Sequence, residues 1–152
     1  MPGQIFNGDG IKFPAVQTPS ADVNILDDYE EGVWTPEIKF DGNAVGMVYA
    51  AQNGFYTKIG NVVHAWAEVI LSAKGSSSGI ATISTPFTAV QRAVASLYLL
   101  AVTYTGAPQA TAQGGTAIVN LQYITEAGNI SNMTQANFSD TSRVYLTIVF
   151  IA

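Results

Sequence analysis

The feature that most restricts how this chain can fold is a series of short stretches, all after Gly32, in which apolar and polar residues alternate. Between residues 62 and 72, for example, every second position from Val63 to Val69 is Val or Ala. A period of two is the pattern of a β-strand with one buried face. The turn-forming pairs Asp41-Gly42, Asn53-Gly54 and Gly60-Asn61 separate neighbouring stretches. The spacing predicts an all-β protein, an antiparallel β-sandwich or jelly roll of about eight strands.

The expected strands follow directly from this alternation. They cover residues 33–40, 47–52, 55–59, 62–72, 81–84, 93–104, 117–124 and 143–151. Asn53-Gly54 is expected to be a tight hairpin turn, and residues 106–115 and 128–140 are expected to be longer loops.

The charge content restricts the partners. Only 11% of the residues are charged while 48% are apolar, which leaves little with which to coat the surface of a monomer, so we expect a homo-oligomer. Six Lys and Arg are spread over a chain of net charge −5, a pattern that does not indicate binding to nucleic acid. The longest apolar run, residues 93–102, is half of the roughly 20 residues that a membrane-spanning helix needs. We therefore expect neither nucleic acid nor a membrane as a partner.

Residues 1–31 show neither helical nor strand periodicity and contain three prolines. They are nevertheless too apolar for a typical disordered tail. We expect an extended N-terminal arm that lies on its own or a neighbouring subunit, followed by a β-sandwich domain over 32–152. The opening MPGQIFNGDG has no basic region and no apolar run, so no secretory signal is predicted. The expected contact residues of the arm are Ile5, Phe6, Ile11, Phe13 and Val16.

The stretch LDDYEEGVWTP places four carboxylates in five positions. Calcium loops alternate Asp or Asn with a central Gly and a distal Glu, and DDYEEG lacks that spacing. Acids this close in sequence also have no fixed separation across a bond to be cleaved. We therefore predict a structural strap, solvated or paired with lysines, in which Trp34 plugs one edge of the core, and we predict no metal and no cofactor. The strap comprises Asp27, Asp28, Tyr29, Glu30, Glu31, Gly32, Trp34 and Pro36.

Other candidates for chemistry are few. His64 is the single histidine, and with no cysteine in the chain it belongs to no recognisable triad or zinc site. No catalytic residue is predicted, and we do not expect an enzyme. Flat rings suit both a glycan and an interface, and eight aromatic residues could form a sugar-stacking surface: Tyr49, Phe55, Tyr56, Trp66, Tyr98, Tyr104, Tyr123 and Tyr145. Of these, four are selected as candidates for stacking on a glycan or for an interface: Tyr56, Trp66, Tyr104 and Tyr123.

The order of GIKFPAVQTPSAD, LDDYEEGVWTP, GFYTKIGNVV, KGSSSG and TISTPFTA resembles the C-terminal domain of tailed-bacteriophage fibres and other virion-surface proteins. The resemblance extends to about Ala89, and the match to D-Y-E-E-G-x-W-T-P is its most specific part. It implies a Pro-containing linker and an acidic strap that lead into a β-sandwich, usually trimeric. It implies no catalytic role for either motif.

From this resemblance we expect a virion structural protein, made in the host cytoplasm and assembled on the particle surface. A whole fibre needs a virion anchor and a shaft, and we expect neither to fit in the residues before the strap, which begins at Asp27. We therefore expect a capsid decoration (cement) protein that forms trimers and contacts the major capsid protein or another virion protein. The alternative is the receptor-binding tip of a tail fibre that recognises host-surface polysaccharide. A glycan hydrolase is a third class, for which no acid pair can be placed.

Overall fold

The computed structural model describes residues 6–7, 10–13, 16, 20–22 and 24–152. Over these residues the protein is all-β and antiparallel, and its single helical element is one short 3-10 turn, η1 (Gln135–Asn137). No helix in this part of the chain is long and apolar enough to cross a membrane. The strands are β1 (Phe6–Asn7), β2 (Gly10–Ile11), β3 (Tyr29–Trp34), β4 (Ile38–Phe40), β5 (Met47–Ile59), β6 (Val62–Lys74), β7 (Ala81–Ala89), β8 (Ala93–Val102), β9 (Ala107–Ala112), β10 (Thr116–Ile124), β11 (Ile130–Asn132) and β12 (Phe138–Ile151).

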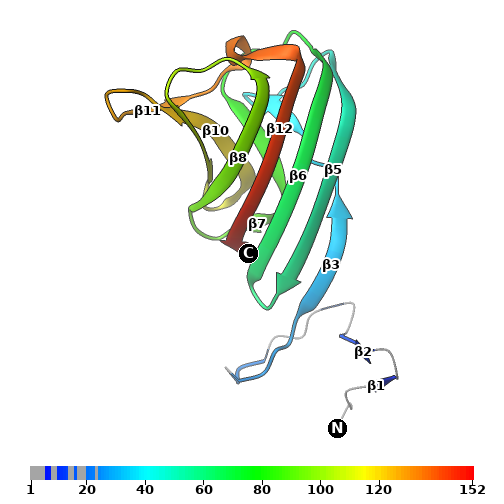
Figure 1. Cartoon of the computed structure of the whole chain (residues 1–152). Helices are drawn as coiled ribbons and strands as arrows, with labels where there is room; N and C mark the ends of the chain where they lie inside the picture. Colours follow the sequence, from blue (N-terminus) through cyan, green and yellow to red (C-terminus); the bar gives the residue numbers. More distant parts are fainter. Residues whose placement is uncertain (1–5, 8–9, 14–15, 17–19, 23) are drawn as a thin grey trace.

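Ten of the described strands form one hydrogen-bonded sheet in the order β3-β5-β6-β12-β8-β9-β10-β7-β4, with β11 paired to β10. The short strands β1 and β2 pair only with each other. The neighbouring strands on one side of the sheet are long: β5, β6 and β12 have 13, 13 and 14 residues. These three strands and β8 lie side by side as one broad layer (Figure 1).

The sheet curls into a half-barrel because two consecutive strands lie at its opposite edges. Only residues 35–37 separate β3 from β4, so the chain links the two edges directly. Side chains of β5 then bridge the gap to the segment that leads into β4. The Tyr49 hydroxyl donates a hydrogen bond to the Ile38 carbonyl at 2.9 Å, and Gln52 Nε2 donates one to the Pro36 carbonyl at 2.9 Å.

The core lies on the inner face of this curl. Along β6, Val63, Ala65, Ala67 and Val69 are fully buried, and they alternate with residues on the outer face. The inner residues of β12 follow the same pattern, which is the period-two alternation seen in the sequence. Further buried residues of the core are Ile38, Phe40, Leu71, Ala81, Ile83, Ala89, Ala110, Ala112, Val119, Leu121, Met133, Phe138, Val144, Leu146, Ile148 and Phe150.

The all-β antiparallel class predicted from the sequence is confirmed. The finer description as a two-sheet sandwich or jelly roll is not confirmed, because hydrogen bonds join the ten strands into one continuous sheet. The predicted hairpin at Asn53-Gly54 is wrong, since β5 runs unbroken through both residues and turns only after Ile59. The predicted loop over 106–115 is also wrong in part, because it contains β9.

Candidate functional site

The acidic strap and the GFYTKIG segment form the two strands of one ladder, β3 and β5. In this register Gly32 lies opposite Tyr56, and Trp34 lies opposite Gly54. A Cβ atom on Gly54 would lie 2.5 Å from the indole nitrogen of Trp34, and one on Gly32 would overlap the Tyr56 side chain. Each glycine therefore provides the space for an aromatic ring of the other strand. This packing explains why Gly54 lies within a strand instead of forming a turn.

A buried ion pair holds the start of β3. Lys58 Nζ pairs with the Asp28 carboxylate, and each residue is 9% exposed. The amide of Gly60 also donates a hydrogen bond to the Asp28 carbonyl at 2.8 Å. Lys58 Nζ lies 6.0 Å from the centroid of the Phe87 ring, which forms an edge contact with Tyr56. Because removing water from a single charge is costly, this pair stabilises the fold only as long as both partners are present.

The other acids of the strap each have a separate partner. Glu30 accepts a hydrogen bond from the Tyr56 hydroxyl, and Glu31 accepts one from the Tyr29 hydroxyl. Asp27 accepts one from the amide of Ser20 at 2.6 Å. The bond to Glu30, followed by burial, raises the pKa of Tyr56 to about 12. Among the residues that the structure describes, no group of three or more acidic or histidine side chains lies close enough to hold a metal ion.

The remaining strap residues pack at the edge of the curl. Pro36 is buried, whereas Trp34 is half-buried against the core, and its buried Nε1 has no hydrogen-bond partner among the described residues. Of the predicted arm contacts, the ring of Phe13 lies 5.7 Å from that of Tyr29, while Val16 is 79% exposed. Phe6 and Ile11 pair as residues of β1 and β2, and Ile5 lies outside the described residues.

A second feature is the outer face of the broad layer, which we call the aromatic face. It comprises the outward residues of β3, β5, β6, β12 and β8. Across it, cross-strand pairing aligns Val33 with Phe55, Phe55 with Trp66 and Tyr145 with Tyr98. The Phe55 and Trp66 rings lie 5.7 Å apart, and the Tyr98 and Tyr145 rings 5.9 Å apart. The aromatic face also contains Ile59, Val62, Ile70, Leu100 and Val149.

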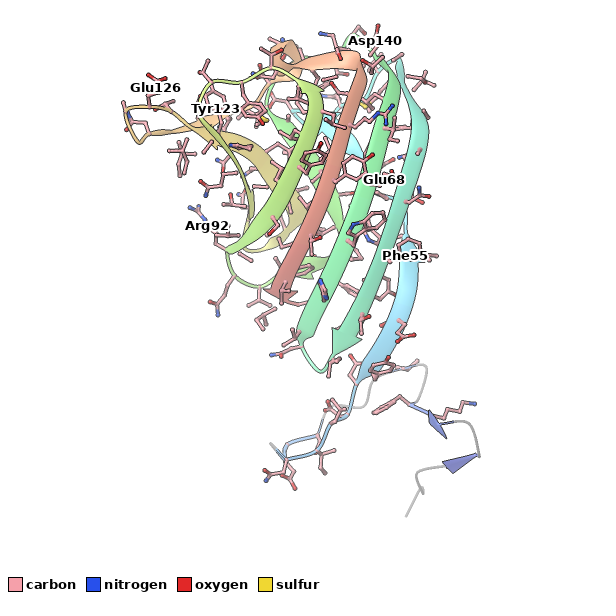
Figure 2. The ribbon with its side chains drawn as sticks, viewed as in Figure 1. Phe55, Glu68, Arg92, Tyr123, Glu126 and Asp140 are labelled. Carbon is pink, nitrogen blue, oxygen red and sulfur yellow. The ribbon has the colours of Figure 1, made fainter. Side chains whose placement is uncertain are left out.

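Polar residues alternate with apolar ones on the aromatic face, and they include Asn53, Thr57, His64, Glu68 and Thr147. Glu68 lies on it, on the strand next to that of Phe55 (Figure 2). Glu68 accepts a hydrogen bond from Asn53 at 2.8 Å. The exposed His64 is paired in register with Thr57 and Val149, so no acid stands opposite it. Glu31 and Arg143 lie toward opposite corners of the face, on β3 and β12, and neither makes an ion pair with another described residue.

The four aromatic residues predicted from the sequence do not lie together. Trp66 is on the aromatic face, whereas Tyr56, Tyr104 and Tyr123 are half-buried against the core. Phe55, Tyr98 and Tyr145, which belong to the wider set of eight aromatic candidates, lie on the aromatic face with Trp66. The sequence could have separated the two groups of rings, because neighbouring residues such as Phe55 and Tyr56 must point to opposite faces of one strand.

The chain was compared with models of protein families, with curated proteins and with solved structures, and no match was found in any of the three.

Proposed function

We propose that this chain is a non-enzymatic structural protein of a bacteriophage virion, a capsid decoration (cement) protein that forms trimers on the particle surface. The observation that carries this proposal is the ladder between β3 and β5. The strap and the GFYTKIG segment, which provide the resemblance to virion-surface proteins, are paired there residue by residue. The acidic and basic side chains at this ladder are engaged in contacts within the chain: Glu30 with Tyr56, Glu31 with Tyr29, and Asp28 with Lys58.

The proposal also assigns roles to the two parts of the chain. Residues 1–31 act as an arm that grips a neighbouring subunit or the major capsid protein. Residues 32–152 act as a sandwich-like surface domain, in which the layer of β4, β7 and β10 backs the broad layer of β5, β6 and β12. A protein that covers a shell needs contact area, and the long strands of this sheet offer it.

The experiment that tests this proposal is the copy number of the chain in purified particles, measured by quantitative mass spectrometry against the major capsid protein. A ratio near the stoichiometry of the shell supports a decoration protein. Absence from washed particles overturns a virion role. A few copies per particle would instead favour a position on the tail.

A tail position is the second candidate, as the receptor-binding tip of a fibre that recognises host-surface polysaccharide. The observation in its favour is the exposed pair of Phe55 and Trp66 next to the polar pair of Asn53 and Glu68. Ring faces beside hydrogen-bonding groups suit the apolar and hydroxyl surfaces of a sugar. Saturable binding of purified host polysaccharide, lost in Trp66→Ala, tests this alternative.

A further inference from the structure

We propose that the aromatic face is the contact surface between copies of this chain, and that the copies form a closed ring of three. The β3 and β5 half of one copy packs against the β12 and β8 half of the next. This inference rests on the trimer in the proposed function and deepens it by naming the surface that the trimer uses.

The first argument is exposure. Val33 is 74% exposed, Tyr98 60%, Phe55 55% and Val149 54%, and all four belong to the aromatic face. Apolar residues scattered singly over a surface are ordinary, but a contiguous apolar patch of several hundred Å² is typical of an interaction site. Aromatic residues are enriched in protein interfaces, and the rings of this face surround the single acid Glu68 on β6.

The second argument is area. With strands about 4.8 Å apart and a rise of about 3.3 Å per residue, five strands around the 13-residue β6 give a face on the order of 1,000 Å². In a ring, each contact uses about half of this face from each of two copies. The total buried per contact is then on the order of 1,000 Å², which is the size at which a specific interface begins.

The third argument is shape and charge. The aromatic face lies on the outer side of the curled sheet (Figure 1), where two neighbours in a ring can each cover one half of it. The two sides of the face also differ in charge, because Glu31 lies on β3 and Glu68 on β6, whereas Arg143 lies on β12. A contact between unlike halves therefore sets an acid against a base, and repeated head-to-tail contacts of this kind form a ring when the rotation between copies closes.

The observations favour another copy over a saccharide as the occupant. A saccharide site needs several convergent hydrogen-bonding groups around its rings. Beside the Phe55 and Trp66 rings, the side chains of Asn53 and Glu68 already bond to each other. A second apolar surface needs none of these groups.

The test measures the mass of the purified full chain by light scattering after size exclusion, for the unmodified protein and for Val33→Asp and Tyr98→Asp. The matched control is Ile130→Asp, which changes a 58% exposed residue on β11, away from the aromatic face. We expect trimers for the unmodified protein and the control, and monomers with unchanged circular dichroism for the two face variants. A monomeric or dimeric unmodified protein, or face variants that remain trimeric, would overturn the inference.

A charge-reversal series keeps the inference testable even if a face variant fails to fold. Glu31→Arg and Arg143→Glu should each weaken trimer association by roughly tenfold, because each sets like charges against one another. The double variant should recover most of the loss, since it restores an unlike pair. No weakening in either single variant, or no recovery in the double, contradicts the contact between unlike halves. The copy number in particles is measured independently of these variants. A decoration protein that assembles through a different surface would therefore pass the copy-number test and fail only the tests of the aromatic face.

Discussion

Successive residues of β12 point to opposite faces of the sheet, and the two faces differ in what covers them. Ile148 points into the core and is 1% exposed, while its neighbour Val149 points outward and is 54% exposed. A strand that is buried on one side needs apolar residues at every second position only. On β6 and β12 both sides are rich in apolar residues, but the chain itself covers just the inner one. The proposed contact between copies would cover the outer side.

The largest expected effect comes from truncating the inner face. Ile148→Ala should lower the free energy of unfolding by about 2–5 kcal/mol, because the side chain is fully packed and leaves a cavity. Val149→Ala should change it by less than about 0.5 kcal/mol in dilute, monomeric protein. Urea denaturation of both variants measures the difference. Equal losses at the two positions would contradict the distinction between the faces.

The buried ion pair should have the next largest effect. Lys58→Met leaves the Asp28 carboxylate buried without its partner and should cost about 3 kcal/mol. Lys39→Met is the control, because the Lys39–Glu37 pair is exposed, with side-chain exposures of 40% and 46%, and should contribute less than about 1 kcal/mol. Denaturant melts compare the two. A Lys58 variant no less stable than the control would show that the pair does not hold the strap.

Gly54→Ala is expected to have an intermediate effect that depends on Trp34. The added methyl would clash with the indole ring, and displacing that ring should cost about 1–3 kcal/mol. In a Trp34→Leu background the same substitution should cost clearly less, because the clashing ring is absent. A double-mutant cycle in urea measures this coupling. Additive losses would argue against the packing of ring on glycine.

The smallest effect is a dependence on alkaline pH. Burial raises the pKa of Tyr49 to about 12, and the bond to Glu30 and burial raise the pKa of Tyr56 to about 12, from an ordinary value of 10.0. The folded state thus favours the protonated phenols, so their contribution to stability is present below pH 10 and is lost as the pH rises toward 12. The variant Tyr49→Phe with Tyr56→Phe should lose less stability across this range. An identical fall of the melting temperature with rising pH in the unmodified protein and the double variant would refute the assignment of this pH dependence to Tyr49 and Tyr56.

The sequence predicted individual strands better than their arrangement. Alternation identified the strands at 62–72 and 143–151 because each has one uniformly buried face, although β6 continues to Lys74 and β12 already begins at Phe138. It failed at Gly54, where a glycine needed to accommodate the distant Trp34 ring has the same local pattern as a turn residue. The neighbours of β12 in the sheet, and therefore the pairing of Tyr98 with Tyr145, depend on long-range contacts that no local pattern specifies.

The measurement that tests the central claim most directly is hydroxyl-radical labelling of the unmodified chain at high and low concentration, read by mass spectrometry. The account predicts that Phe55, Trp66 and Tyr98 are protected at high concentration and labelled after dilution, while Ile130 is labelled equally in both. Equal labelling of all four residues at both concentrations would contradict a copy-to-copy contact on the aromatic face.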